Sequence, residues 1–233
     1  MARILYLHGS GHTLESFAPQ VASFSGSESM ALPGHPAGEP LGSVAEMARW
    51  LKDEIIADGV EPAVVCGNSL GSAVALQTAL TFPERVAGLI LIGAGARLRV
   101  GAHIFTMIDE NWPSCIDELV AYSVASSCSQ ELRFRLRAMH LEAGQRSTRA
   151  DYSACNAFDV MASVSSVAVP ALVVVGSEDQ MTPPKYATFL HEALAGSTLT
   201  VVEGAGHLPH LERPDVVDDA IRSFMEVVES PGH

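Results

Sequence analysis

Basic residues and long apolar runs are both scarce in this chain. Of its 233 residues, 14 are Lys or Arg and 27 are Asp or Glu, which gives a net charge of −13. Because nucleic acids and anionic membrane surfaces attract basic proteins, the sequence predicts neither of them as a partner. No apolar run approaches the roughly 20 residues of a membrane-spanning helix, so we expect no membrane span.

Cysteine is also rare, and no pattern of metal or cofactor ligands is present. Four irregularly spaced cysteines argue against a disulfide scaffold or a C-x-x-C site and favour reduced thiols in the cytoplasm. The first residues enter an apolar strand pattern without the regions of a signal peptide, which agrees with a cytoplasmic location. The nine histidines lack H-E-x-x-H spacing, and no glycine-rich phosphate loop follows a predicted strand. We therefore expect no metal and no cofactor.

What the chain does contain is an alternation of short apolar runs with helix-like segments. With 48% apolar residues it is large enough for one sizeable core. The alternation is typical of a mostly parallel sheet with helices on both faces, so we expect an α/β fold. The predicted strands are residues 3–7, 28–32, 62–66, 86–92, 170–175 and 198–203.

Two helices are marked most clearly. In the first, at 44–57, Ser43 and Glu46 have the spacing of a capping box, and an apolar stripe follows at the helical period. The second, at 214–229, begins at Pro214 and carries apolar residues on one face. We expect both apolar faces to meet the core.

One region interrupts the alternation. Residues 97–165 contain no convincing strand pattern and indicate several short helices, broken near Pro113, Ser129 and Gly144. We therefore expect a core made of residues 1–96 and 166–233, with 97–165 inserted as a helical cap. The apolar residues of this cap would either roof a cleft or pack the cap onto the core. They are Phe105, Met107, Ile108, Trp112, Leu119, Phe134, Leu136 and Met139.

A G-x-S-x-G segment lies between a predicted strand and a predicted helix. The small residues Gly67 and Gly71 let strand and helix approach closely, so Ser69 would occupy a strained turn that exposes its hydroxyl. The next N–H, that of Leu70, would begin the helix and face a developing oxyanion. The motif alone can arise by chance, but this context favours Ser69 as a nucleophile.

A serine nucleophile needs a general base, and the base needs a carboxylate that fixes its tautomer. Asp179 follows one predicted strand and His207 follows the next. The carboxyl ends of parallel strands share one edge of the sheet, where open α/β sheets form their sites. Two competitors are close in sequence, Glu178 for the acid and His210 for the base, although the motif register disfavours both.

Four motifs occur in this order along the chain. They are His8-Gly9-Ser10-Gly11 after the first strand, Gly67 to Gly71, Gly176-x-x-Asp179-x-x-x-Pro183, and Gly206-His207 with Glu212 and Pro214. Together they resemble the α/β-hydrolase superfamily, in particular its small capped esterases, lactonases and carbon–carbon hydrolases, over essentially the whole chain. The resemblance implies a triad of Ser69, Asp179 and His207, and it implies that the backbone N–H groups of Ser10 and Leu70 bind the oxyanion.

Two positions depart from the family's usual pattern. The loop after the second strand reads Pro33-Gly34-His35-Pro36 where the family often has P-G-H-G. Directly after the G-x-S-x-G segment, Ser72 stands where the family often has a second glycine. We expect the second change to matter little to the chemistry.

His8 is expected to make a structural hydrogen bond. The acidic residues of the cap, which we expect to be surface caps or hinges, are Asp109, Asp117, Asp151 and Asp159.

The resemblance implies an enzyme of the carboxylesterase type, a serine hydrolase that acts on a small carboxylic ester or a related acyl compound. Two other functions stay open. The same triad would serve a carbon–carbon bond hydrolase or an enol-lactonase, and the fold without activity would serve a ligand receptor. A hydroxynitrile-lyase-like reaction is disfavoured, because related lyases use a cap lysine and both lysines of this chain, Lys52 and Lys185, lie outside the predicted cap.

Overall fold

The central sheet is parallel and contains every predicted strand. A computed structural model describes residues 3–57, 59 and 62–230 of the chain. These residues form a six-stranded sheet in the order β2-β1-β3-β4-β5-β6, in which every neighbouring pair is parallel. The expected α/β fold is confirmed. The strands are β1 (Ile4–Leu7), β2 (Glu28–Met30), β3 (Ala63–Asn68), β4 (Val86–Ile92), β5 (Ala171–Gly176) and β6 (Thr198–Val202).

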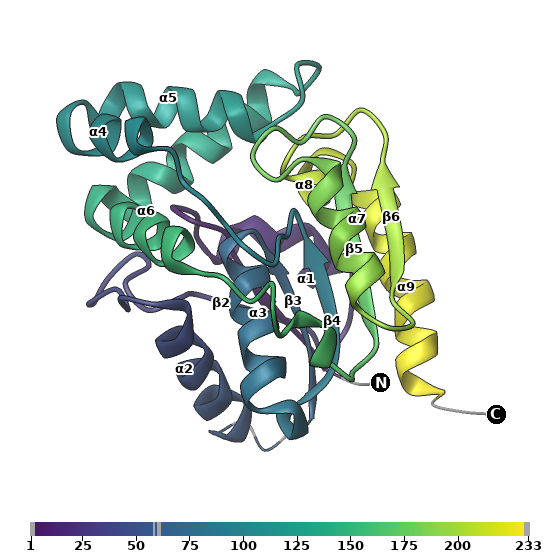
Figure 1. The fold of residues 1–233 in the computed structure, drawn as a ribbon. Helices are drawn as coiled ribbons and strands as arrows, with labels where there is room; N and C mark the ends of the chain where they lie inside the picture. The colour runs from purple at the N-terminus through teal and green to yellow at the C-terminus, as the bar shows by residue number, and fades with distance from the viewer. Residues whose placement is uncertain (1–2, 58, 60–61, 231–233) are drawn as a thin grey trace.

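Helices cover both faces of the sheet (Figure 1). One face carries α2 (Val44–Ala57), α3 (Leu70–Thr81) and α7 (Pro184–Ala193), and the other carries α1 (Ala18–Ser23) and α9 (Pro214–Glu229). Each face buries its own apolar cluster. Successive residues of β5 alternate between the two clusters, because the side chains of a strand point to opposite faces.

The sequence signals for the two clearest helices are confirmed. The Ser43 Oγ accepts a hydrogen bond from the Glu46 N–H at 3.3 Å and donates one to the Glu46 carboxylate at 2.9 Å, so Ser43 caps α2. Helix α9 begins at Pro214 and buries Ile221 and Phe224 in the cluster beneath it. Local signals therefore determine where both helices begin.

Residues 97–165, the predicted cap, contain α4 (Ala102–Glu110), α5 (Trp112–Ser123) and α6 (Gln130–Ala157). Pro113 lies in the first turn of α5, Ser129 caps α6, and Gly144 has a non-helical backbone inside α6, so the three expected breaks are confirmed. Helices α4 and α5 lie beyond the carboxyl ends of the strands (Figure 1). The end of the segment, from Ala154 to Val164, packs in an apolar cluster of the sheet, and the division into core and cap stays a prediction.

Short helical turns complete the described chain. They are η1 (Leu14–Phe17), η2 (Pro83–Arg85), η3 (Val164–Ser166) and α8 (Pro209–Glu212). In the part of the chain that the structure describes, no helix combines the length and the hydropathy needed to cross a bilayer.

Several histidines are buried, and four of them have a lowered pKa. Burial disfavours the charged ring and lowers the pKa to about 3 for His8 and His210, to about 4 for His140, and well below its ordinary value for His12. These four rings are therefore neutral at pH 7. They lie between the helices and the loops at the carboxyl edge of the sheet rather than on the surface.

Replacement of Ile221 by Ala in α9 is expected to lower the free energy of unfolding by about 2–4 kcal/mol, because it leaves a cavity in the apolar cluster. The matched control is Val227→Ala on the same helix, since Val227 is 58% exposed. This control should change stability by less than about 0.5 kcal/mol. Chemical denaturation measures both values, and equal losses would contradict the placement of this helix.

Acid is expected to destabilise the protein as the pH falls below about 6.5, the ordinary pKa of histidine. The unfolded chain binds protons that the buried rings do not, so the free energy of unfolding falls until the pH reaches the folded pKa values, about 4 for His140 and about 3 for His210. His210→Gln removes one such group and should flatten the fall of melting temperature between about pH 7 and pH 5. Scanning calorimetry of both proteins measures the two slopes, and identical slopes would refute this assignment.

Candidate active site

Ser69 lies at the sharp turn between β3 and α3. Its backbone has φ 53° and ψ −111°, and it is the only non-glycine residue with a positive φ in the described ranges. This conformation is strained for an L-residue and persists only where the surrounding structure imposes it. The strained turn expected from the G-x-S-x-G segment is therefore confirmed.

Two glycines make this turn possible. A Cβ atom added to Gly67 would overlap the backbone of Gly71, and one added to Gly71 would overlap the carbonyl group of Leu7 in β1. The strand, the helix and the neighbouring strand approach one another more closely than any side chain permits. The spacing of the motif follows from this contact.

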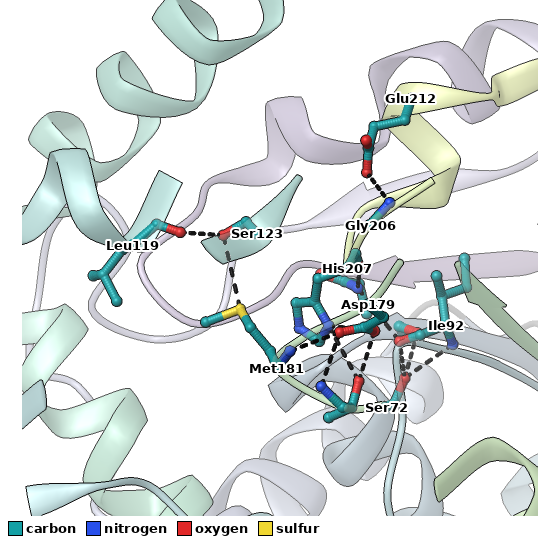
Figure 2. A network of polar contacts seen from close by, with 12 residues as sticks. Ser72, Ile92, Leu119, Ser123, Asp179, Met181, Gly206, His207 and Glu212 are labelled. Atoms are coloured by element: carbon teal, nitrogen blue, oxygen red, sulfur yellow. Dashed lines mark hydrogen bonds and ion pairs between the residues drawn. The ribbon is translucent and has the colours of Figure 1, made fainter. Parts of the chain in front are cut away.

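Ser72, which stands where relatives often have glycine, bonds to the neighbouring strand (Figure 2). Its Oγ accepts the Ile92 N–H at 3.1 Å and lies within donating distance of two carbonyl oxygens, those of Gly67 at 2.5 Å and Ile92 at 3.0 Å. The Ser69 N–H donates to the same Ile92 carbonyl oxygen at 2.9 Å. The end of β4 is thereby tied to the turn that carries Ser69.

Asp179 and His207 meet where β5 and β6 end (Figure 2). The His207 Nδ1 lies 2.8 Å from the Asp179 Oδ2, and both side chains are buried. The Asp179 Oδ1 accepts the N–H groups of Met181 and Thr182, each at 2.9 Å, and the Thr182 hydroxyl donates to Oδ2 at 2.9 Å. Thr182, for which the sequence analysis found no role, completes the set of donors around this carboxylate.

These hydrogen bonds keep Asp179 ionised. Burial alone would raise its pKa, but the charge of His207 and the bonds from His207 and Thr182 outweigh burial and hold the pKa below its ordinary value. An ionised carboxylate only accepts hydrogen bonds, so the Nδ1 of His207 carries the proton between them. In the neutral ring Nε2 is then free to accept a proton, as a general base requires.

The loop that carries His207 is held from several sides. The His207 N–H donates to the carbonyl oxygen of Ser123 at the end of α5 (2.8 Å), and the Gly206 N–H donates to the Glu212 carboxylate (2.8 Å). The other Glu212 oxygen accepts the N–H of Ala125, just beyond α5 (2.8 Å). The Asn68 side chain donates to the His207 carbonyl oxygen (3.1 Å). These bonds fix the backbone of His207 relative to the turn that carries Ser69.

The loop after β1 is held in the same manner. The His8 Nε2 accepts the N–H of Leu32, in the loop after β2, at 3.0 Å, which confirms the structural hydrogen bond expected for His8. The His12 N–H donates to the Gly9 carbonyl oxygen at 3.2 Å, and Gly11 has a φ of 67°. These are features of a type II turn, which needs a positive φ at its third position. Ser10 occupies the second position of this turn.

One cavity of about 240 Å³ brings candidate residues together. Ser69, His207 and Ser10 line it, while Asp179 lies behind His207. Leu70 does not line it, but as the first residue of α3 its N–H has no acceptor within the helix. The competing residues lie apart from the cavity: Glu178 is exposed, and His210 is buried in α8, where its Nε2 lies 3.3 Å from the Ser16 hydroxyl.

Of the two roles left open for the eight apolar cap residues, the structure shows packing. None of those eight residues is among the described residues that line the cavity. Phe134 is 69% exposed, and the other seven pack in two clusters between the helices of the insertion, one of which also contains Leu208 and Leu211 of the core. These helices therefore bury their apolar stripes on each other and on the core. The cavity wall is instead mixed in polarity and includes Ile104, Tyr122, His140 and Tyr152.

Asp151 is a second correction, because it is not a surface residue. It is fully buried, its Oδ2 accepts the Gly11 N–H at 2.8 Å, and the same oxygen lies 3.0 Å from the His35 Nε2. The other three acids of the cap, Asp109, Asp117 and Asp159, are exposed, as expected. Each of them forms an ion pair with an arginine. Through His35, Asp151 also holds the loop after β2. This is the loop that departs from the usual family pattern, so the resemblance did not imply its contacts.

Comparisons with known proteins agree with this fold. A profile of the alpha/beta hydrolase family matches residues 4–220. The pimeloyl-[acyl-carrier protein] methyl ester esterase of Neisseria meningitidis serogroup A / serotype 4A is 26% identical over 258 aligned positions, which cover 98% of this chain and 78% of that protein.

Solved structures extend the agreement to three dimensions. A thermophilic esterase superposes with a TM-score of 0.89 at 32% identity, covering 97% of this chain and 90% of that one. The enol-lactonase from Burkholderia xenovorans LB400 shares the fold with a TM-score of 0.89 at 21% identity, covering 97% and 91%. The family profile, the order of the strands in the sheet and the strained turn at Ser69 agree, and this chain belongs to the alpha/beta hydrolase family.

Proposed function

We propose that this protein is a serine hydrolase that cleaves a small carboxylic ester through an acyl-enzyme. One observation carries the proposal: Ser69, held in a strained turn, shares a cavity with His207, whose Nδ1 is bonded to the ionised Asp179. A nucleophile, a base and an orienting carboxylate are the parts that acyl transfer to serine requires. The names of the Neisseria relative and of the thermophilic structure, both esterases, support the choice of an ester.

In the first half-reaction the Nε2 of His207 takes the proton of Ser69 while the serine Oγ bonds to the acyl carbon. The carbonyl oxygen becomes an oxyanion in a tetrahedral intermediate. His207 then returns the proton to the leaving alkoxide oxygen, the carbon–oxygen bond of the ester breaks, and the alcohol departs. Asp179 stays ionised throughout and stabilises the imidazolium form of His207.

The backbone N–H groups of Ser10 and Leu70 are proposed to bind the oxyanion. Leu70 opens α3, where unpaired N–H groups and the positive end of the helix dipole favour negative charge. Ser10 lines the cavity from the β1 loop. Donors held in place before the reaction stabilise the developing charge without reorganising, and each is worth about 3 kcal/mol.

In the second half-reaction water replaces the alcohol. His207 removes a proton from the water as its oxygen attacks the acyl carbon of the acyl-enzyme, and the same two N–H groups hold the second oxyanion. When this intermediate breaks down, the proton passes from His207 to the Oγ of Ser69. The acid product leaves and the enzyme returns to its starting state.

The size of the cavity favours a small acyl group. At about 240 Å³ it lies just below the range of roughly 300–1,000 Å³ that is usual for ligand pockets. A carbon–carbon bond hydrolase or an enol-lactonase would use the same triad. Activity toward simple esters therefore separates the leading proposal from these two alternatives.

Replacing Ser69 by Ala is expected to abolish hydrolysis of p-nitrophenyl esters, because it removes the nucleophile while the cavity stays intact. A series of esters of increasing acyl length, assayed with the wild type and the variant in parallel, measures the loss, and the optimum length reports the usable depth of the cavity. Undiminished turnover by Ser69→Ala would refute the proposed mechanism. A folded wild type that hydrolyses none of these esters would favour an enol-lactone or a carbon–carbon substrate.

Asp179→Asn is expected to reduce kcat by about 10³-fold to 10⁴-fold, because the amide no longer holds the His207 tautomer or stabilises its charge. The adjacent Glu178→Gln is the matched control, since it makes the same change from acid to amide on an exposed side chain. Steady-state kinetics of both variants on the best ester measures the difference. If Glu178→Gln lost the activity and Asp179→Asn kept it, the acid would have been assigned to the wrong residue.

A further inference from the structure

One face of α6 lies along the loops at the carboxyl edge of the sheet. Three buried residues spaced four apart carry this contact, Ser147, Asp151 and Cys155. The Ser147 hydroxyl donates to the Gly34 carbonyl oxygen at 2.7 Å, and the Cys155 Sγ lies 3.5 Å from the Ser10 Oγ. Asp151, between them, is the only one of the three with a carboxyl group; burial raises the pKa of this group, while the bonds from His35 and Gly11 oppose that rise.

The carboxylate of Asp151 joins two loops that are far apart in sequence. Its Oδ2 accepts the Gly11 N–H at 2.8 Å and lies 3.0 Å from the His35 Nε2. The His35 Nδ1 lies 3.3 Å from the Leu32 carbonyl oxygen, which can only accept, so this nitrogen donates. Burial lowers the pKa of His35, but the bond to Asp151 outweighs burial and raises it overall. His35 therefore holds Asp151 from the side opposite to Gly11.

The Gly11 N–H belongs to the central peptide of the turn from Gly9 to His12. The central peptide of a β-turn has one of two orientations related by a flip, that of a type I turn or that of a type II turn, and the positive φ of Gly11 corresponds to type II. With the observed orientation the N–H points to a carboxylate. The flipped peptide would present the Ser10 carbonyl oxygen to Asp151 instead, which places two acceptors against each other. Asp151 therefore stabilises one orientation of the peptide directly after the Ser10 N–H.

The surroundings leave this turn little freedom. A Cβ atom added to Gly11 would meet the His140 ring and the Thr148 hydroxyl, so α6 abuts the turn from outside. The turn also lines the cavity through Ser10. A displacement of the Gly11 peptide would thus be transmitted to the Ser10 N–H, one peptide away.

We propose that Asp151, supported by His35, is a positioning residue that holds the Ser10 N–H in the geometry that binds the oxyanion. This inference rests on the proposed function of the same site and deepens it. Asp151 does not line the cavity and does not touch the substrate. It acts through the Gly11 peptide, so its loss should weaken binding of the transition state much more than binding of the substrate.

Asp151→Leu removes both carboxyl oxygens while keeping a side chain of similar shape, so the Gly11 N–H loses its acceptor. It is expected to lower kcat about 10-fold to 100-fold while KM changes less than about 3-fold, because loss of a whole oxyanion donor costs about 10²-fold to 10³-fold and here the donor is only displaced. The inhibition constant of a trifluoromethyl ketone, which forms a tetrahedral oxyanion on Ser69, should rise by the same factor as kcat/KM falls. Thermal melts check that the variant is folded. A wild-type kcat, or a loss confined to KM, would overturn the inference.

Ser147→Ala is the matched control on the same face of α6. It removes the bond to Gly34 and weakens the docking of the helix without touching the Gly11 N–H. It should lower the melting temperature and leave kcat and the ketone affinity unchanged. If Ser147→Ala lowered kcat as much as Asp151→Leu, helix docking would explain the effect and the positioning role would be refuted.

Two further measurements keep the test decisive. If Asp151→Leu does not fold, Asp151→Glu keeps the carboxyl group but displaces the acceptor from Gly11, and a wild-type kcat in that variant would overturn the inference. If no ester is turned over, the rate of labelling by a p-nitrophenyl phosphonate replaces kcat, and an unchanged rate in Asp151→Leu would overturn it. Ser69→Ala in the same assays identifies a failure of the proposed function, because full activity or labelling of that variant refutes the triad independently of Asp151.

Discussion

The site depends on one close contact, in which β3, α3 and β1 pack together with no room for a side chain at Gly67 or Gly71. This contact forces Ser69 into a positive φ and lifts its hydroxyl to the edge of the sheet. The surrounding bonds then hold other parts relative to the turn. Ser72 ties it to β4, and the Asn68 side chain ties it to the loop that carries His207. The strain at Ser69 is thus sustained by packing on all sides.

The sequence predicted those features whose causes lie within a few residues of one another. The glycines on either side of Ser69 act within a single turn, and the cap of α2 acts within its first turn. Five of the six strands are short apolar runs between turn signals; β2, which reads Glu28-Ser29-Met30 at the edge of the sheet, followed from the alternation of the segments around it. Asp179 and His207 followed from the same logic, since each comes directly after a strand whose end is fixed by its own sequence.

The remaining features depend on residues that meet only in the folded chain. Asp151 bonds to Gly11 across 140 positions and to His35 across 116, whereas Asp117, in a similar helical segment, stays on the surface. Nothing near either aspartate in sequence distinguishes them. The apolar stripes of the insertion have the same period whether they face a cavity, one another or the core, so the sequence left the roof of a cleft and packing of the cap both open. Thr182 was missed because its role exists only once His207 lies beside it.

The position of the insertion has a consequence for the order in which the protein becomes able to react. Strands β4 and β5 are neighbours in the sheet, yet residues 93–170 lie between them. Closing so long a loop costs chain entropy before the pairing of β4 with β5 repays it. Strands β1 to β4 pair without that cost, so we expect them to assemble first. The nascent protein would then hold a formed nucleophile turn that stays inert until β5 and β6 deliver the acid and the base.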